Sequence, residues 1–148
     1  MEERSDWSEG VGEERIAQIK QEGIRLDLKN IYFRYPNSGE YILENINISV
    51  RPGERLALIG LNGAGKTTLV KLICGFFSPT QGEILLNNIP IKSFSRAEYL
   101  ELCTVLFQDS TLLPLTLDRN LTGQSPEQID RKKLDWALEL SGFKNKYE

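Results

Sequence analysis

The residues that could do chemistry gather in one glycine-rich turn, GLNGAGKT, at residues 60–67. Its glycines, at 60, 63 and 65, allow the backbone to curl until successive amide N–H groups point into one concavity, which can bind an anion. Lys66 adds a full positive charge, and a helix beginning here would add about half a charge at its N-terminus. The spacing matches the P-loop pattern G-x-x-x-x-G-K-[ST] and predicts a site for the phosphates of a nucleotide.

The two threonines after the lysine extend this prediction from phosphate to metal. The Thr67 hydroxyl is placed for Mg²⁺, and Thr68 can reach a neighbouring phosphate oxygen. A charge-assisted hydrogen bond from Lys66 to phosphate would contribute roughly 1.5–3 kcal/mol. The alternative is a glycine-rich turn that holds nothing. A buried strand before the turn and an amphipathic helix after it, which the sequence also predicts, favour the P-loop.

Those flanking elements follow from hydrophobic periodicity. Apolar and polar residues alternate over 24–35 and 41–50, which predicts two strands, and the apolar run RLALIG at 55–60 predicts a strand buried on both faces. Leu69, Leu72 and Ile73 mark the inner face of a helix, which Gly75 is suited to end.

The remainder of the chain carries turn and capping signals. We expect a hairpin at 83–91 with Asn87 and Asn88 in its turn, and a short helix opened by a capping box at Ser95 and Glu98. Further along, we expect a buried strand at 103–107, a short helix near residue 117, and an amphipathic helix within 125–142. The last of these would turn Leu134, Ala137 and Leu138 inward.

Residues 1–23 differ in composition from the rest. They are polar, acidic and punctuated by glycine, so we interpret them as a linker or flexible arm with a possible short helix near Ile16. Trp7 is isolated in this segment, and we expect it in an exposed tail. The folded domain is therefore predicted to occupy residues 24–148.

Bulk composition excludes several classes of protein. The chain has 148 residues, a net charge of −3 and no block of lysine and arginine, which argues against a nucleic-acid surface. Its printed residues show neither an apolar stretch long enough to cross a bilayer nor a secretory signal, so we expect no direct membrane insertion. Cys74 and Cys103 have no metal-ligand spacing and are expected to be buried in a reducing compartment.

From residue 24 onward, several segments in order resemble the nucleotide-binding domain of ATP-binding-cassette (ABC) transporters, nearest to the exporter kind. LKNIYFRYP at 28–36 resembles the family's aromatic-loop strand, and 42–91 follows the family's pattern through the P-loop. TVLFQD at 104–109 resembles its glutamine loop, and LTLDRNL at 115–121 the segment after it. The resemblance implies an incomplete α/β P-loop NTPase fold: a β-rich subdomain, a P-loop core and the start of the helical subdomain.

The resemblance also implies roles for particular residues, with ATP and Mg²⁺ as ligands. Tyr35 would stack on the adenine, an interaction of about 1–3 kcal/mol by analogy with nucleic-acid readers. Gln108 would complete the Mg²⁺ environment with Thr67 and sense the γ-phosphate, so that Lys66 and Gln108 contribute to catalysis. The triphosphate would be held by Gly60, Asn62, Gly63, Gly65, Lys66, Thr67 and Thr68.

Members of this family work with partners. The resemblance implies a second nucleotide-binding domain that sandwiches ATP, and transmembrane domains whose export of cargo is coupled to ATP hydrolysis. The complete protein would then lie at the cytoplasmic face of a membrane.

The printed residues lack other parts of the family's machinery. After Gln108 there is no glycine-rich signature, Walker B aspartate or catalytic glutamate, and the chain has no histidine for the switch position. We therefore expect a truncated domain that binds Mg-ATP weakly and turns it over negligibly. The strand at 55–60 would lack its Walker B neighbour, which predicts a marginal monomer prone to aggregation.

Two alternatives remain open at this point. The strand ending at Asp109 could be the Walker B strand of a soluble P-loop kinase or NTPase, although Gln108 interrupts its apolar run. A non-transport ABC ATPase of repair or translation would be marked by basic surface clusters, which the sequence does not show.

Overall fold

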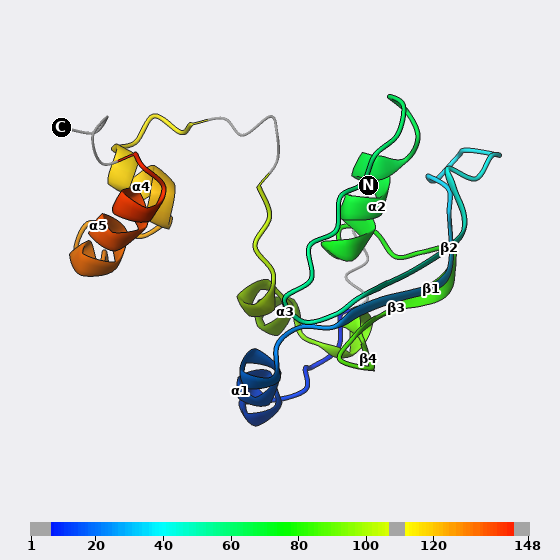
Figure 1. Ribbon diagram of the computed structural model, residues 1–148, viewed down its shortest axis with the longest axis horizontal. Helices are drawn as coiled ribbons and strands as arrows, with labels where there is room; N and C mark the ends of the chain where they lie inside the picture. Colours follow the sequence, from blue (N-terminus) through cyan, green and yellow to red (C-terminus); the bar gives the residue numbers. More distant parts are fainter. Residues whose placement is uncertain (1–6, 107–111, 144–148) are drawn as a thin grey trace. The chain divides into compact units, whose positions relative to one another are not determined.

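The computed structural model describes residues 7–106 and 112–143, and the chain divides into two compact units (Figure 1). The first unit is Met1–Val105 and the second is Leu106–Glu148. The first contains the sheet and the glycine-rich turn, and the second contains two helices. Each unit is described by itself.

An antiparallel sheet organises the first unit. Its strands are β1 (Leu26–Phe33), β2 (Leu43–Val50), β3 (Gln81–Leu86) and β4 (Ile89–Pro90), in the order β2-β1-β3-β4. The central strand β1 pairs Leu28 with Ile48 of β2 and with Ile84 of β3. The two strands predicted from the alternation at 24–35 and 41–50 are therefore confirmed.

The hairpin between β3 and β4 forms as its sequence predicts. Asn87 and Asn88 lie in its turn with φ angles of 48° and 64°. Asparagine tolerates this left-handed region better than most residues because its short side chain can hydrogen-bond locally. The register Leu86–Ile89 then closes a two-residue turn.

Helix α2 (Lys66–Ile73) covers one face of the sheet (Figure 1). Its Leu69 and Leu72 are buried in the main core, as their helical spacing predicts. The core also takes residues from β1, β3, the 3₁₀ turn η1 (Ile91–Ser93) and helix α3 (Arg96–Leu102). The predicted capping box of α3 is present, with Ser95 and Glu98 bonded to each other's backbone amides.

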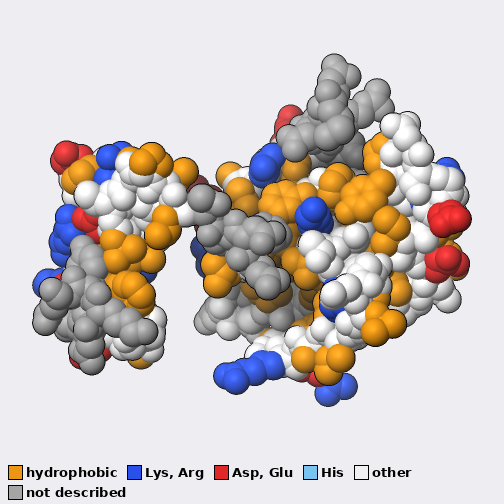
Figure 2. All heavy atoms as spheres, turned by 90° about the horizontal axis from the view of Figure 1, so that it is seen from above, with side chains coloured by type: hydrophobic (Ala, Val, Ile, Leu, Met, Phe, Trp, Pro, Cys, Tyr) orange, Lys and Arg blue, Asp and Glu red, His pale blue; other side chains and the backbone are white. Residues whose placement is uncertain are grey.

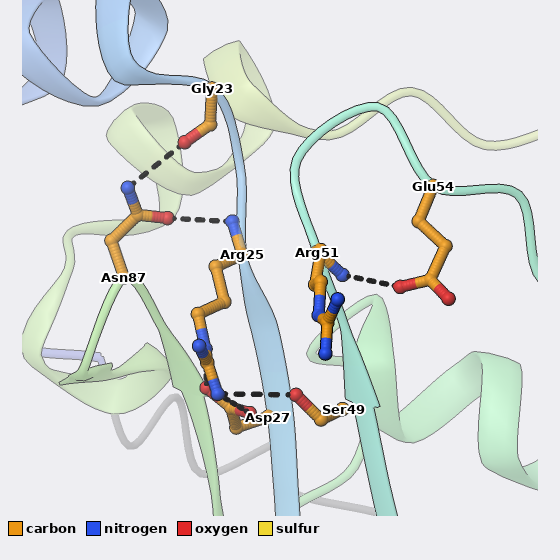
Figure 3. A network of polar contacts seen from close by, with 7 residues as sticks. All are labelled: Gly23, Arg25, Asp27, Ser49, Arg51, Glu54 and Asn87. Atoms are coloured by element: carbon orange, nitrogen blue, oxygen red, sulfur yellow. Dashed lines mark hydrogen bonds and ion pairs between the residues drawn. The ribbon is translucent and has the colours of Figure 1, made fainter.

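A polar network fastens the N-terminal end of β1 to its neighbours (Figure 3). The guanidinium of Arg25 pairs with Asp27, at 2.7 Å, and also donates to the Ser49 hydroxyl on β2. The Asn87 side chain accepts from the Arg25 amide and donates to the Gly23 carbonyl. Because Asp27 is only 6% exposed, the ion pair is what allows its charge to be buried.

The short helix expected near Ile16 forms, but the described part of residues 1–23 packs on the core and is not a flexible arm. Residues Glu13–Glu22 form helix α1, whose Ile16 and Ile19 are 3% and 0% exposed within the main core. Trp7 packs against the same core rather than lying in an exposed tail. The polar composition hid this contact because only a few apolar residues of the segment face inward.

Neither of the two predicted buried strands forms. Residues 55–60 are exposed and belong to no helix or strand. Residues 103–106, the described part of the second segment, also belong to no helix or strand, and Leu106 is exposed. A buried strand needs a neighbour that pairs with its backbone groups. Among the described residues no strand lies beside either segment.

The second unit contains helices α4 (Leu117–Thr122) and α5 (Arg131–Leu140). The side chain of Asp130 caps α5, and Leu134 and Leu138 are buried with Ile129. Ala137 is exposed, so its predicted inward orientation is wrong. Asp118 and Arg131 join the helices through an ion pair of 2.8 Å. The pKa of Asp118 is lowered first by the Thr116 hydroxyl, then by the Arg119 amide, and last by Arg131.

Candidate phosphate-binding site

Two glycines of the glycine-rich turn have left-handed backbone conformations. Gly63 and Gly65 have φ angles of 84° and 83°, a region that side chains make costly. Gly65 also caps α2, and a Cβ atom on it would lie 2.8 Å from Leu43 Cδ2 and 3.2 Å from the Ile42 carbonyl oxygen. Only glycine lets the helix begin this close to the start of β2.

The ammonium group of Lys66 lies over the turn. Its Nζ donates to the carbonyl oxygens of Gly60 and Leu61, at 2.8 and 2.7 Å. The lysine therefore folds back over the turn and does not extend away from it. Gly60, Asn62 and Gly63 are exposed, so this side of the turn is open to a ligand.

The two threonines of the first turn of α2 occupy different environments. Thr67 is exposed, which leaves its hydroxyl free to reach a metal ion or a phosphate. Thr68 is 7% exposed, and its hydroxyl is 3.2 Å from that of Tyr35. The predicted role of Thr68 on a phosphate oxygen would require it to share its hydroxyl with the tyrosine.

Tyr35 contacts the P-loop helix through Thr68, and part of its ring already has partners. It meets Phe33 and Phe77 edge-on, with ring centroids 5.1 and 5.4 Å away. Its side chain is half-buried, and one contact joins it to α2 through Thr68. Stacking of Tyr35 on adenine stays a prediction.

The residues present fit a magnesium-bound nucleotide. Mg²⁺ keeps several waters and takes one or two protein oxygens in addition to the substrate's phosphates. Thr67 is the residue that would supply one such oxygen, and Lys66 would supply charge for the phosphates. The other predicted metal contact, Gln108, and the alternative one, Asp109, lie outside the described residues. In the described part of the chain no cluster of acidic, cysteine or histidine residues could hold a metal by itself.

Sequence reasoning missed the residues that hold the far end of α2. The Tyr99 hydroxyl of α3 donates to the Ile73 carbonyl, and Trp7 lies against Tyr99 with ring centroids 5.4 Å apart. Burial raises the pKa of the Tyr99 phenol, so it stays protonated as a donor. The one available signal was a tryptophan in an otherwise polar segment.

Comparison with known proteins decides the family. Residues 43–148 match the family described as ABC transporter. The chain belongs to the ABC transporter family. The subtilin transport ATP-binding protein SpaT of Bacillus subtilis is 42% identical over 113 residues, 76% of this chain and 18% of that protein. A putative multidrug export ATP-binding/permease protein of Staphylococcus aureus is 33% identical over 93% of this chain and 23% of its own length.

Solved structures agree with the sequence comparison. A bacterial Atm1-family ABC exporter with ATP bound superposes with a TM-score of 0.71 and 28% identity, over 78% of this chain and 20% of that one. The P-loop NTPase assignment and the exporter-like resemblance are therefore confirmed. This ABC transporter chain spans about a fifth of the length of these relatives. None of its described helices is long and apolar enough to span a bilayer.

Proposed function

We propose that this chain binds Mg-ATP at residues 60–68 and serves as the nucleotide-binding part of a transporter motor. The observation that carries the proposal is the Lys66 ammonium, 2.8 Å from the Gly60 carbonyl over a turn whose glycines at 63 and 65 are left-handed. Relatives named for subtilin transport and multidrug export, and a related structure with ATP bound, support both parts of it.

Each residue of the site would act by a simple physical contact. Lys66 exchanges its two carbonyl partners for phosphate oxygens, and the N-terminal end of α2 opposes the remaining negative charge. The Thr67 hydroxyl and Gln108 hold Mg²⁺, which neutralises charge on the phosphates. Tyr35 contacts the adenine, and its hydroxyl keeps the first turn of α2 in register.

Hydrolysis requires more than this charge neutralisation. A water must be positioned and deprotonated, and the printed residues after Gln108 contain no signature, Walker B or switch histidine to do so. We therefore propose that these 148 residues bind Mg-ATP and turn it over negligibly by themselves. In the working transporter, this part would lie at the cytoplasmic face of the membrane. A second nucleotide-binding domain would dimerise with it across ATP, and transmembrane domains would carry out export.

The test is titration calorimetry of Mg-ATP against the chain and its Lys66→Ala variant, with phosphate release followed in parallel. Saturable binding that Lys66→Ala abolishes is expected, without steady phosphate release. Lys71→Ala removes the same charge from the last turn of α2 and should bind normally. Equal binding by the chain and Lys66→Ala contradicts the site, and steady release that Lys66→Ala abolishes contradicts the proposed lack of turnover.

Substitution also separates the transporter from a soluble P-loop kinase or NTPase. The transporter site predicts that Gln108→Ala and Tyr35→Ala weaken Mg-ATP binding, whereas Asp109→Ala leaves it within about twofold. The opposite pattern, with Asp109→Ala alone abolishing magnesium-dependent binding, would assign Asp109 to the metal.

A further inference from the structure

The segment before the sheet is attached to the P-loop helix at the end remote from the phosphate site. We call this segment, residues 7–22, the strap. Its Trp7 lies over Gly75, directly after α2, where a Cβ atom would come within 2.5 Å of Trp7 Cζ2. Gly75 has a φ of 71°, which disfavours any residue with a side chain, and the absence of a side chain leaves room for the indole ring.

The strap is bound to three other parts of the first unit. The Ser8 amide donates to the carbonyls of Lys92 and Phe94, at 3.1 and 3.3 Å. The amides of Val11 and Gly12 donate to the carboxylate of Glu98, which also caps α3. Lastly, Ile16 and Ile19 of α1 are buried in the main core. These contacts hold the backbone from Ser8 to Gly12, directly after Trp7, and helix α1 against the first unit.

Tyr99 transmits this restraint to the helix. Its ring is 1% exposed and lies beside both Trp7 and Phe94, while its hydroxyl donates to the Ile73 carbonyl at the C-terminal end of α2. The other carbonyls of this last turn, those of Val70, Lys71 and Leu72, accept from backbone amides directly after the helix. Tyr99 supplies the donor for the Ile73 carbonyl, which has no partner within the helix. Trp7 covers Gly75 and the Tyr99 ring together and so clamps the last turn of α2.

The length of α2 makes this clamp matter at the phosphate site. An eight-residue helix is about 12 Å long, so a tilt of about 10° at one end displaces the other by about 2 Å. Such a displacement exceeds the tolerance of hydrogen bonds from the turn to a phosphate. A helix free to tilt must also be ordered when ligand binds, and that ordering costs affinity.

We propose that Trp7 is a positioning residue for nucleotide binding: through Gly75 and Tyr99 the strap pre-orders the P-loop helix. This rests on the proposed function, because it presumes that the turn binds Mg-ATP. By thermodynamic linkage, nucleotide binding in turn tightens the packing of Trp7. The strap lies outside residues 43–148, the part of the chain that the ABC transporter family model matches.

The first test measures Mg-ATP affinity by calorimetry at a temperature where circular dichroism shows every variant folded. Trp7→Ala should weaken binding by about fivefold or more, and Trp7→Phe, which keeps a ring over Gly75, should restore most of it. Tyr99→Phe, which loses only the bond to Ile73, should weaken it by up to about fivefold. Trp136→Ala, at a 61% exposed tryptophan of the second unit, is the matched control and should bind normally.

The second test leaves Trp7 in place and does not depend on the folding of a Trp7 variant. In a Trp136→Phe background, Trp7 is the only tryptophan, so acrylamide quenching reports on its packing alone. Saturating Mg-ATP should reduce that quenching, and Lys66→Ala should abolish the reduction. Quenching unchanged by bound Mg-ATP, or a folded Trp7→Ala variant with unchanged affinity, would overturn the inference but not the proposed function. Failure of the unsubstituted chain to bind Mg-ATP would overturn both.

Discussion

At the scale of single residues, Gly65 carries two constraints at once. Its left-handed φ of 83° disfavours any side chain, and Leu43 and Ile42 occupy the space a side chain would need. Gly53 has a similar φ of 74°, and a Cβ atom added to it would have nothing within 4 Å, so it isolates the conformational part of the cost.

We therefore expect Gly65→Ala to lower the free energy of unfolding by about 2–4 kcal/mol, since overpacking adds about 1–3 kcal/mol to the left-handed penalty. Gly53→Ala should cost only about 1–2 kcal/mol. Urea unfolding, followed by Trp7 fluorescence in a Trp136→Phe background, measures the free energy of unfolding of the first unit in both variants. Equal losses in the two variants would show that the contact with Leu43 is unimportant.

Tyr35 raises a different question at this scale, because its ring is partly engaged by Phe33 and Phe77. If it contacts adenine, Tyr35→Ala should weaken Mg-ATP binding by about tenfold, from a stack of about 1–3 kcal/mol. Inorganic triphosphate lacks a base, so its binding should change little. Tyr35→Phe keeps the ring and loses only the bond to Thr68. Equal weakening of ATP and triphosphate would assign Tyr35 to positioning α2 instead.

At the scale of elements, the strands are joined by charge as well as by backbone hydrogen bonds. The Arg25 guanidinium, followed by the Ser49 hydroxyl, lowers the pKa of Asp27 from 3.8 to about 2. A lowered carboxyl pKa stabilises the fold fully above the unfolded value, and the contribution is lost as pH falls through the folded one. The relevant window therefore lies between about pH 4 and pH 2.

Asp27→Asn should thus lower the free energy of unfolding by about 1–2 kcal/mol at pH 6. This loss is smaller than the full pKa shift would give, because Arg25 is partly in water and solvent screens the ion pair. The difference from the unsubstituted chain should shrink as pH falls from 4 to 2. Urea midpoints over this range, with the same tryptophan reporter, provide the check, and Asp135→Asn on an exposed face of α5 serves as control. A difference that stays constant with pH would argue against the ion pair.

At the scale of the whole molecule, apolar side chains remain on the surface of both units (Figure 2). In the first unit the junction between the preceding segment and the P-loop contributes strongly: Ile59, just before the turn, is 95% exposed, and Leu61, within it, is 85% exposed. Exposed apolar chain that could pair as a strand favours association with a second molecule.

We expect the chain to self-associate with rising concentration, and Ile59→Lys to reduce this. Light scattering over a concentration series provides the measurement. Leu100→Lys, at a 55% exposed leucine of α3, adds the same charge away from the segment. Equal improvement by both variants would attribute the effect to net charge, and a sharp thermal transition independent of concentration would contradict self-association altogether.

The sequence by itself determined the features whose physics is local. The φ angles of Gly63 and Gly65, the Asn87–Asn88 turn, the Ser95–Glu98 capping box and the inner face of α2 depend on neighbours a few residues away. The proposed phosphate site could be located from the sequence for the same reason, since one short turn and one helix N-terminus contain most of its residues.

Tertiary structure decided what depends on distant partners. Residues 55–60 have the composition of a buried strand but lie exposed, because a strand exists only beside another that pairs with it. Conversely, residues 7–22 are polar in composition but pack on the core, because Trp7, Ile16 and Ile19 find their partners in α2, α3 and the sheet. Composition describes a segment alone, whereas burial depends on which surface meets it.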